Sequence, residues 1–263
     1  MNLGLQDARV LVTAASQGLG AATARQFSLE GAQVVINSRS AGKLQSTASR
    51  IREESGNAIY DHAADVTDSA AVAGLINYTV DILGGLDVLV TNAGGPPAGT
   101  FDAFDLDAWR EASNLTLISA VNLIRDALPH LRQSSRAAIL AITSIAVKQP
   151  VDNLTLSNAI RPAVVGLTKT LSLELAGDGI RVNSILPGVT DTERVTKLVE
   201  FRAEENGTDK ETERASFASS IPLKRIGKPE EFANAAVFLC SPAAGFITGV
   251  ALPVDGGAIR ATL

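Results

Sequence analysis

The segment RVLVTAASQGLG, residues 9–20, decides the fold, because it joins a short apolar strand to a glycine-containing turn that opens a helix. Four further apolar runs follow, separated by amphipathic stretches, at residues 32–37, 86–94, 137–144 and 180–188. Runs without polar alternation are typical of a parallel sheet that helices cover on both faces. The pattern predicts an α/β fold with a doubly wound parallel sheet flanked by helices on both faces.

Composition excludes several classes of protein. The chain has 263 residues, a net charge of −5, 46% hydrophobic and 19% charged residues, which indicates a globular protein and argues against a nucleic-acid partner. We expect no membrane span, since no apolar run reaches about eighteen residues, and no signal peptide, since Asp7 and Arg9 interrupt the N-terminal segment. The single cysteine, Cys240, gives neither a disulfide nor a metal cluster. These features predict a cytoplasmic protein without a metal site.

We expect a single domain over residues 1–263, because no linker or internal repeat divides the chain. One charged segment, at about 190–220, departs from the alternating pattern and follows the last central strand. Long insertions after strands in such sheets often cover the substrate, so the segment predicts a substrate lid. The alternative is a solvated pair of helices that contacts no ligand.

The turn from Thr13 to Gly20 is the first candidate binding site. Glycines here would let backbone N–H groups approach a pyrophosphate at the positive end of the following helix. The spacing differs from G-x-G-x-x-G, and a turn that binds no ligand is the alternative. Further motifs follow in order: Asp65–Val66, TNAG at 91–94 and PG at 187–188.

On these motifs the chain resembles the short-chain dehydrogenase/reductase family over essentially its full length, and within it the 3-oxoacyl-acyl-carrier-protein reductases. The resemblance implies a Rossmann-like fold and a glycine motif T-G-x-x-x-G-x-G, in which Ala14 replaces the first glycine. If that position needs a positive φ, Ala14 is strained by roughly 1 kcal/mol. The resemblance implies cofactor contacts from Thr13, Ser16, Gly18, Leu19, Gly20, Ser38, Arg39, Asp65, Val66, Asn92, Ala93, Gly94, Pro187, Gly188, Val189 and Thr192.

Charge at the end of the second strand favours NADP as the cofactor, with NAD as the alternative. NAD-specific members of the family carry a carboxylate there, which binds the ribose hydroxyls and would repel a 2′-phosphate. This chain has Asn37, Ser38 and Arg39 instead. A guanidinium suits a phosphate, although Gln17 stands where many NADP-dependent relatives carry a basic residue.

The catalytic residues match the family only in part. The resemblance implies that Asn114 supports a relay water and that Ser144 binds the carbonyl oxygen, while Ser157 and Arg161 stand in place of the tyrosine and lysine of the Y-x-x-x-K motif. An alkyl hydroxyl is a far weaker acid than a phenol, and losing a positioned acid costs roughly 10²–10⁴ in rate. Arg161 stays charged and cannot replace the acid.

Other titratable side chains offer little replacement. The two tyrosines and two histidines, Tyr60, Tyr78, His62 and His130, are expected away from this edge of the sheet, and Lys148 is the nearest alternative proton-handling group in sequence. Pro162 predicts that the regular helix begins near Ser157–Arg161 or is kinked there.

These residues predict an NADP(H)-dependent oxidoreductase acting on a small carbonyl or alcohol substrate with an atypical proton donor. The alternatives are a nucleotide-binding sensor or assembly partner without turnover, and a structural remnant with neither property. An acyl carrier protein is a poor partner, because residues 190–214 hold more acidic than basic residues; the acidic ones are Asp191, Glu193, Glu200, Glu204, Glu205, Asp209, Glu211 and Glu213. The resemblance implies a homo-oligomer, a tetramer or dimer, formed through residues 105–131, 154–177 and the C-terminal segment.

Overall fold

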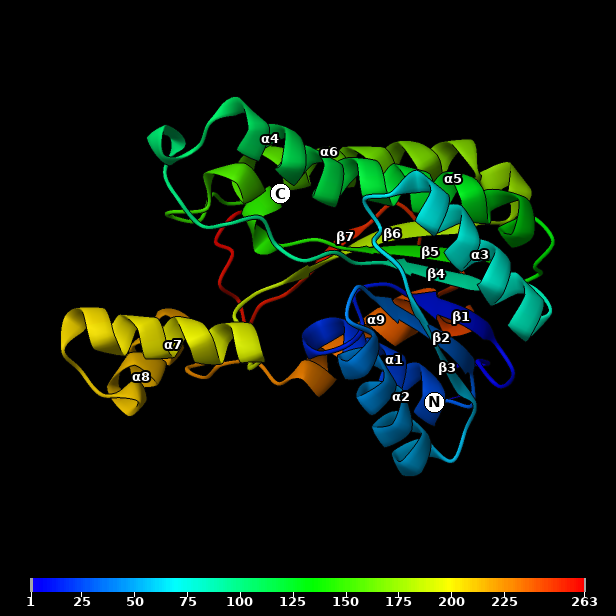
Figure 1. Cartoon of the computed structure of the whole chain (residues 1–263), viewed down its shortest axis with the longest axis horizontal. Coiled ribbons are helices and arrows are strands. Elements are labelled where there is room, and N and C mark those ends of the chain that lie inside the picture. Colours follow the sequence, from blue (N-terminus) through cyan, green and yellow to red (C-terminus); the bar gives the residue numbers. More distant parts are fainter. Residues whose placement is uncertain (1, 263) are drawn as a thin grey trace.

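The computed structural model describes residues 2–262, which form one seven-stranded parallel sheet in the order β3-β2-β1-β4-β5-β6-β7 (Figure 1). The predicted doubly wound sheet is confirmed. The strands are β1 (Arg9–Val12), β2 (Gln33–Ser38), β3 (Ile59–Ala63), β4 (Val88–Thr91), β5 (Ala138–Ile142), β6 (Arg181–Pro187) and β7 (Ala251–Val254).

The two outer strands, β3 and β7, were not among the five predicted. β3 carries polar residues at Asp61 and His62, and β7 contains Pro253, so neither has the continuous apolar run that marks the inner strands. Each pairs with one neighbour only, as edge strands do, and proline is tolerated in such a strand.

Helices cover both faces of the sheet. On one face lie α1 (Gly18–Leu29), α2 (Ala41–Ser55) and α9 (Pro229–Cys240), and on the other α3 (Ser69–Leu83), α4 (Leu106–Ser113), α5 (Ser119–Leu131) and α6 (Thr155–Glu174) (Figure 1). Local signals set their ends: Asp68 accepts from the first backbone N–H groups of α3, and Gly84 ends it with a left-handed residue. The sheet therefore has a buried core on each side.

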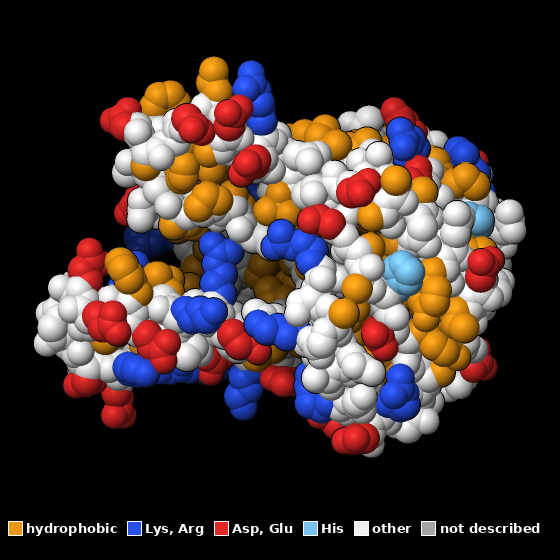
Figure 2. Space-filling view, viewed as in Figure 1, with side chains coloured by type: hydrophobic (Ala, Val, Ile, Leu, Met, Phe, Trp, Pro, Cys, Tyr) orange, Lys and Arg blue, Asp and Glu red, His pale blue; other side chains and the backbone are white. Residues whose placement is uncertain are grey.

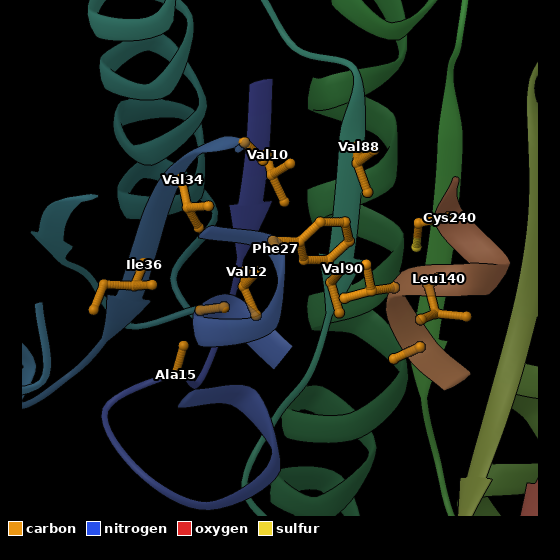
Figure 3. Packing of buried hydrophobic residues seen from close by; sticks show 14 of the residues in the cluster. Val10, Val12, Ala15, Phe27, Val34, Ile36, Val88, Val90, Leu140 and Cys240 are labelled. Carbon is orange, nitrogen blue, oxygen red and sulfur yellow. The ribbon is translucent and has the colours of Figure 1, made fainter. Parts of the chain in front are cut away.

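Phe27 of α1 lies at the centre of one core. It is fully buried and packs among valines of β1 and β4, including Val10, Val12 and Val88 (Figure 3). Cys240 of α9 lies in the same cluster, and burial raises the pKa of its thiol to about 12. The cysteine is thus a packing residue, as a small apolar side chain would be.

The regular helix begins two residues before the predicted start near Ser157–Arg161, and the alternative of a kink there stays a prediction. Helix α6 begins at Thr155 and continues without a break through Pro162 to Glu174. Proline removes only the hydrogen bond to the carbonyl of Asn158, while Leu156, Ile160 and Val164 anchor the helix on either side by burial. Packing outweighs the loss of one bond.

The charged segment at 190–220 forms two helices, α7 (Glu193–Asn206) and α8 (Lys210–Ser220), which we call the α7–α8 hairpin. It projects from the end of β6, away from the other helices (Figure 1). The buried carboxylate of Glu213 accepts hydrogen bonds from Asn206 and Thr208, which ties the two helices together. Nowhere between residues 2 and 262 is a helix long and apolar enough to span a membrane.

Candidate active site

The predicted cofactor residues lie where the carboxyl ends of β1, β4 and β6 meet, which is where ligands bind in such sheets. The side chains of Thr13 and Asn92 join the ends of β1 and β4 at this edge. The Thr13 hydroxyl donates to the Asn92 carbonyl over 2.7 Å, and the Asn92 side chain donates to the Ala14 carbonyl over 3.2 Å. The turn after β1 is therefore fixed against the end of β4.

The turn itself has the geometry expected of a phosphate-binding loop. Gly18 has φ +59° and Ala14 has φ +47°. Ala14 therefore adopts a left-handed conformation, which costs an alanine more free energy than the glycine that the family motif has at this position. At Gly20 a Cβ atom would lie 2.5 Å from the Ala14 carbonyl oxygen, so only glycine fits. Leu19 packs its side chain against the core, and the Ser16 carbonyl accepts a hydrogen bond from Thr47 of α2. The first backbone N–H groups of α1, which its N-cap side chain does not bond, are free for an anion.

Predicted residues for the adenosine end also come together. The Arg39 guanidinium lies 3.9 Å from the Asp65 carboxylate, and the arginine side chain is 75% exposed. Hydrogen bonds from the backbone and side chain of Thr67, opposed in part by burial, hold the pKa of Asp65 below its usual value. Ser38 ends β2 beside Arg39, and Val66 is buried next to Asp65. Arg39 keeps most of its guanidinium open to a ligand.

The loop after β6 completes this edge. The Gly188 N–H donates to the Val254 carbonyl of β7, and a Cβ at Gly188 would lie 2.7 Å from the Cα of Asp255. Thr192 precedes α7 at its N-cap position, without a capping side-chain hydrogen bond, and lies against the Gly18 turn, with its methyl group 3.7 Å from where a Cβ of Gly18 would be. Pro187 and Val189 flank Gly188 in this loop. The β6 loop therefore reaches over the β1 turn.

At the end of β4, Ala93 and Gly94 differ in their surroundings. Ala93 lines a small cavity, whereas a Cβ at Gly94 would meet nothing within 4 Å. The backbone of Gly94 is open enough for a flat ligand to lie against it.

The four predicted catalytic residues lie on elements that pack against one another: Ser144 precedes the short helix η3 (Ile145–Val147), Ser157 and Arg161 lie on α6, and Asn114 begins the π-helical turn η2 (Asn114–Ile118). Such turns are frequent at functional sites. The Asn114 amide donates to the Thr67 carbonyl over 3.4 Å, and the Ser144 hydroxyl accepts from the Ala146 N–H. Within residues 2–262, no hydrogen bond joins two of these four side chains.

Arg161 is the most unusual of the four. The residue is only 9% exposed, and its Nη1 donates to the Thr143 carbonyl over 2.9 Å. Burial, and to a smaller degree the charge of Arg194, lower the pKa of Arg161 to about 10. The guanidinium is therefore still charged at neutral pH and cannot exchange a proton with a substrate.

The tyrosines and histidines lie elsewhere in the fold. Tyr60 and His62 are on the edge strand β3, and His62 stacks on Tyr78 of α3 with ring centroids 4.5 Å apart. His130 lies near the end of α5. Lys148 is exposed on the loop after η3. No phenol stands in for the missing one at the described edge of the sheet.

Two features of this edge were not predicted from the sequence. Arg194 of α7 reaches the segment after β4, where its guanidinium leaves no room for a Cβ at Gly95. The one sequence feature that could have indicated it is its position two residues after the predicted cofactor residue Thr192. A cavity of about 20 Å³, room for about one water, adjoins Arg161, Asn92 and Thr116. A larger one of about 120 Å³ lies on the far side of the β6 loop, lined by residues that include Val189, Ile221 and Phe232.

A family model described as enoyl-(acyl carrier protein) reductase matches residues 13–258. The chain belongs to the short-chain dehydrogenase/reductase family. It is 35% identical over 248 residues to the cis-4-hydroxycyclohexanecarboxylate dehydrogenase of Sinomonas cyclohexanicum, covering 94% of each chain. Membership confirms the predicted family and makes the protein an oxidoreductase of the short-chain dehydrogenase/reductase type.

Two solved structures of the family are similar over nearly the whole chain. The L-sorbose reductase of Gluconobacter frateurii, in complex with NADPH and L-sorbose, has a TM-score of 0.96 and 33% identity, covering 99% of this chain and all of that one. A short-chain oxidoreductase of Pseudomonas aeruginosa, bound to NADPH and described as containing an atypical catalytic center, has a TM-score of 0.90 and 31% identity, covering 98% and 100%. Both relatives bind the cofactor predicted from Arg39.

Proposed function

We propose that this protein is an NADPH-dependent oxidoreductase that reduces a small carbonyl compound, or oxidises the corresponding alcohol, without a catalytic tyrosine. The observation that carries the proposal is the meeting of three loops around Gly18 and Gly20, with an open cation, Arg39, at one end. The NADPH complexes of two relatives support the choice of cofactor.

The residues of this edge fit NADPH part by part. The N–H groups at the start of α1 would bind the pyrophosphate, and Arg39 the 2′-phosphate, with Asp65 and Val66 beside adenine. Thr192 and the β6 loop would hold the carboxamide end, with Asn92, Ala93 and Gly94 along the nicotinamide ribose. When bound, the cofactor supplies or accepts the hydride.

Proton transfer would rest on weaker groups than in relatives with a tyrosine. The Ser144 hydroxyl would donate to the substrate carbonyl oxygen, and the proton would come from Ser157 or from a water held by Asn114. Arg161 would stabilise negative charge near the reacting oxygen without giving up its own proton. We expect a rate about 10²–10⁴ below that of a tyrosine-containing enzyme, because the general acid is poorly matched to neutral pH.

The α7–α8 hairpin is the proposed substrate lid. Figure 2 reveals a hollow between this hairpin and the body of the domain, with Lys and Arg side chains at its rim. The hollow suits a small molecule. The acidic excess on the hairpin argues against an acyl carrier protein, despite the description of the matching family model.

A second candidate function is a nucleotide-binding protein, a sensor or assembly partner, that has lost turnover. Two observations favour it. Ser157 stands where relatives have a phenol, and Arg161 stays protonated at neutral pH, so neither side chain is an effective proton donor. The cofactor contacts would be retained, while the step that needs a proton donor would not.

We also propose a cytoplasmic homo-oligomer, a tetramer or a dimer. Helices α4, η2 and α6 carry exposed apolar side chains at Leu106, Ile118 and Leu173. These helices lie in the segments for which the family resemblance implies contacts between subunits. Sedimentation of the purified protein would reveal the number of subunits.

The test is a titration of the purified protein with NADPH and NADH followed by nicotinamide fluorescence, then addition of a carbonyl panel while absorbance is recorded. Tight NADPH binding with oxidation supports the enzyme. Tight binding with no oxidation across the panel supports the sensor. Failure to bind either cofactor contradicts both.

A further inference from the structure

Two arginines at the proposed substrate side of the site, Arg161 of α6 and Arg194 of α7, lack a carboxylate partner within residues 2–262. Eleven ion pairs join residues 2–262, and neither Arg161 nor Arg194 takes part in any of them. In the described part of the chain, Arg161 has a single hydrogen-bond acceptor, the Thr143 carbonyl. A buried charge without a partner is costly.

The Arg194 side chain extends from the start of α7 to the backbone of Gly95. Its Nη1 would lie 2.1 Å from a Cβ at Gly95, so the guanidinium contacts the backbone just beyond the end of β4. Arg194 therefore places one cation beside Gly95, and Arg161 is a second, buried cation that lines the small cavity with Asn92. Thr116, whose buried hydroxyl has no partner, lines the small cavity beside Arg161.

We propose that the substrate carries a carboxylate, which Arg194 binds over the end of β4 while Arg161 adds a second positive charge beneath it. The inference rests on the proposed function, since it names the substrate class of the same site. A bound carboxylate would neutralise the two cations and accept hydrogen bonds that the protein leaves unmade.

The phosphates of the cofactor are the other source of anionic oxygen near this edge. They are expected at the start of α1, and the side chains closest to Gly18 there are Thr192 and Glu193, not Arg194. Glu193 directs its carboxylate towards that turn, with Oε2 3.9 Å from the Cβ position of Gly18. Arg194 lies instead against Gly95, directly after the TNAG segment, and the NADPH affinity of an Arg194 variant separates the two sources.

The experiment compares cyclohexanecarboxylate with the neutral cyclohexanecarboxamide, two probes of similar shape that cannot react. Their dissociation constants are measured by calorimetry on the full chain loaded with NADP⁺, and again without cofactor. We expect the carboxylate to bind at least about tenfold more tightly, the gain typical of a hydrogen bond to a charged group.

Variants assign the preference to one side chain. Arg194→Gln should reduce the carboxylate-to-carboxamide ratio at least about threefold, with the charge of Arg161 left in place, and should leave NADPH affinity within about twofold. Arg194→Lys should keep most of the preference. Lys169→Gln, which removes one charge from an exposed position two turns beyond Arg161 on α6, is the matched control and should change neither value.

Three results would overturn the proposal: equal affinities in the unmodified protein, a preference that Arg194→Gln leaves undiminished, or a loss of NADPH affinity in that variant as large as the loss for the carboxylate. The last would assign Arg194 to the cofactor phosphates. A protein that binds NADPH and prefers the carboxylate but oxidises no NADPH contradicts the proposed enzyme and leaves the carboxylate site standing.

Discussion

Replacing Gly20 by alanine tests the cofactor loop most sharply, because the space there is defined by backbone atoms. The new Cβ would lie 2.5 Å from the Ala14 carbonyl oxygen and 3.0 Å from the Cα of Ala15, so the turn must move. Overpacking of this kind costs about 1–3 kcal/mol of folding stability. The same carbonyl accepts from Asn92, so a shift also loosens the link to β4.

Binding should suffer more than folding. Misplacing one or two N–H groups that meet the pyrophosphate loses about 2–4 kcal/mol, because hydrogen bonds to charged groups contribute about 1.5–3 kcal/mol each. The dissociation constant of NADPH, measured by fluorescence titration, should therefore rise roughly 30- to 1,000-fold. Gly74→Ala is the control, since Gly74 lies in α3 with nothing within 4 Å of its Cβ position. A folded Gly20→Ala protein whose NADPH affinity stays within threefold of the parent would refute this reasoning.

Three further predictions concern the adenosine end, the proton donor and acid stability. Arg39→Asp should weaken NADPH about 10- to 100-fold and improve NADH, measured by the same titration, because a carboxylate repels the 2′-phosphate; unchanged NADPH affinity would mean that Arg39 does not bind it. Ser157→Tyr combined with Arg161→Lys should raise kcat about 10²–10⁴-fold by restoring a phenol beside a cation; a turnover no faster than that of the parent at saturating NADPH would count against the assigned positions. Asp87→Asn should lower the free energy of unfolding in urea by about 2–4 kcal/mol, because Asp87 is buried and accepts from Arg9 and Ser134. Burial alone would raise the pKa of Asp87, but these hydrogen bonds outweigh it and lower the pKa from 3.8 to about 2. The ionised carboxylate therefore contributes about 2 kcal/mol of folding stability above pH 4, which should be lost as the pH falls to about 2. The Asp87→Asn variant should not show this loss.

The inner part of the fold was predictable because its strands are fully buried. Runs such as RVLV and AILAI leave no polar alternation, and the structure places them in the middle of the sheet. The edge strands β3 and β7 escaped prediction because most of their residues are only partly buried, which admits Asp61, His62 and Pro253. An apolar run in the sequence reveals a strand only where that strand is fully buried, so partly buried strands are missed.

The site was predictable where backbone geometry fixes the residue type. Gly18 and Gly20 are explained by a positive φ and a close approach, and the resemblance to the family motif T-G-x-x-x-G-x-G indicated both positions. Arg194 could not be found in this way, because its role depends on where the hairpin sends a long side chain. The course of α6 through Pro162 was likewise beyond local rules, since packing of distant residues decides it.

The most direct test of the central claim, hydride transfer without a catalytic tyrosine, is to follow deuterium. The protein is incubated with NADPH deuterated at C4, in each of the two stereochemical forms, and with a carbonyl panel that includes oxo acids, and the products are measured by mass spectrometry. The account predicts that one of the two forms transfers its deuterium to the carbinol carbon of a product alcohol, faster than in buffer alone. Tight NADPH binding with no labelled alcohol from either form would contradict it.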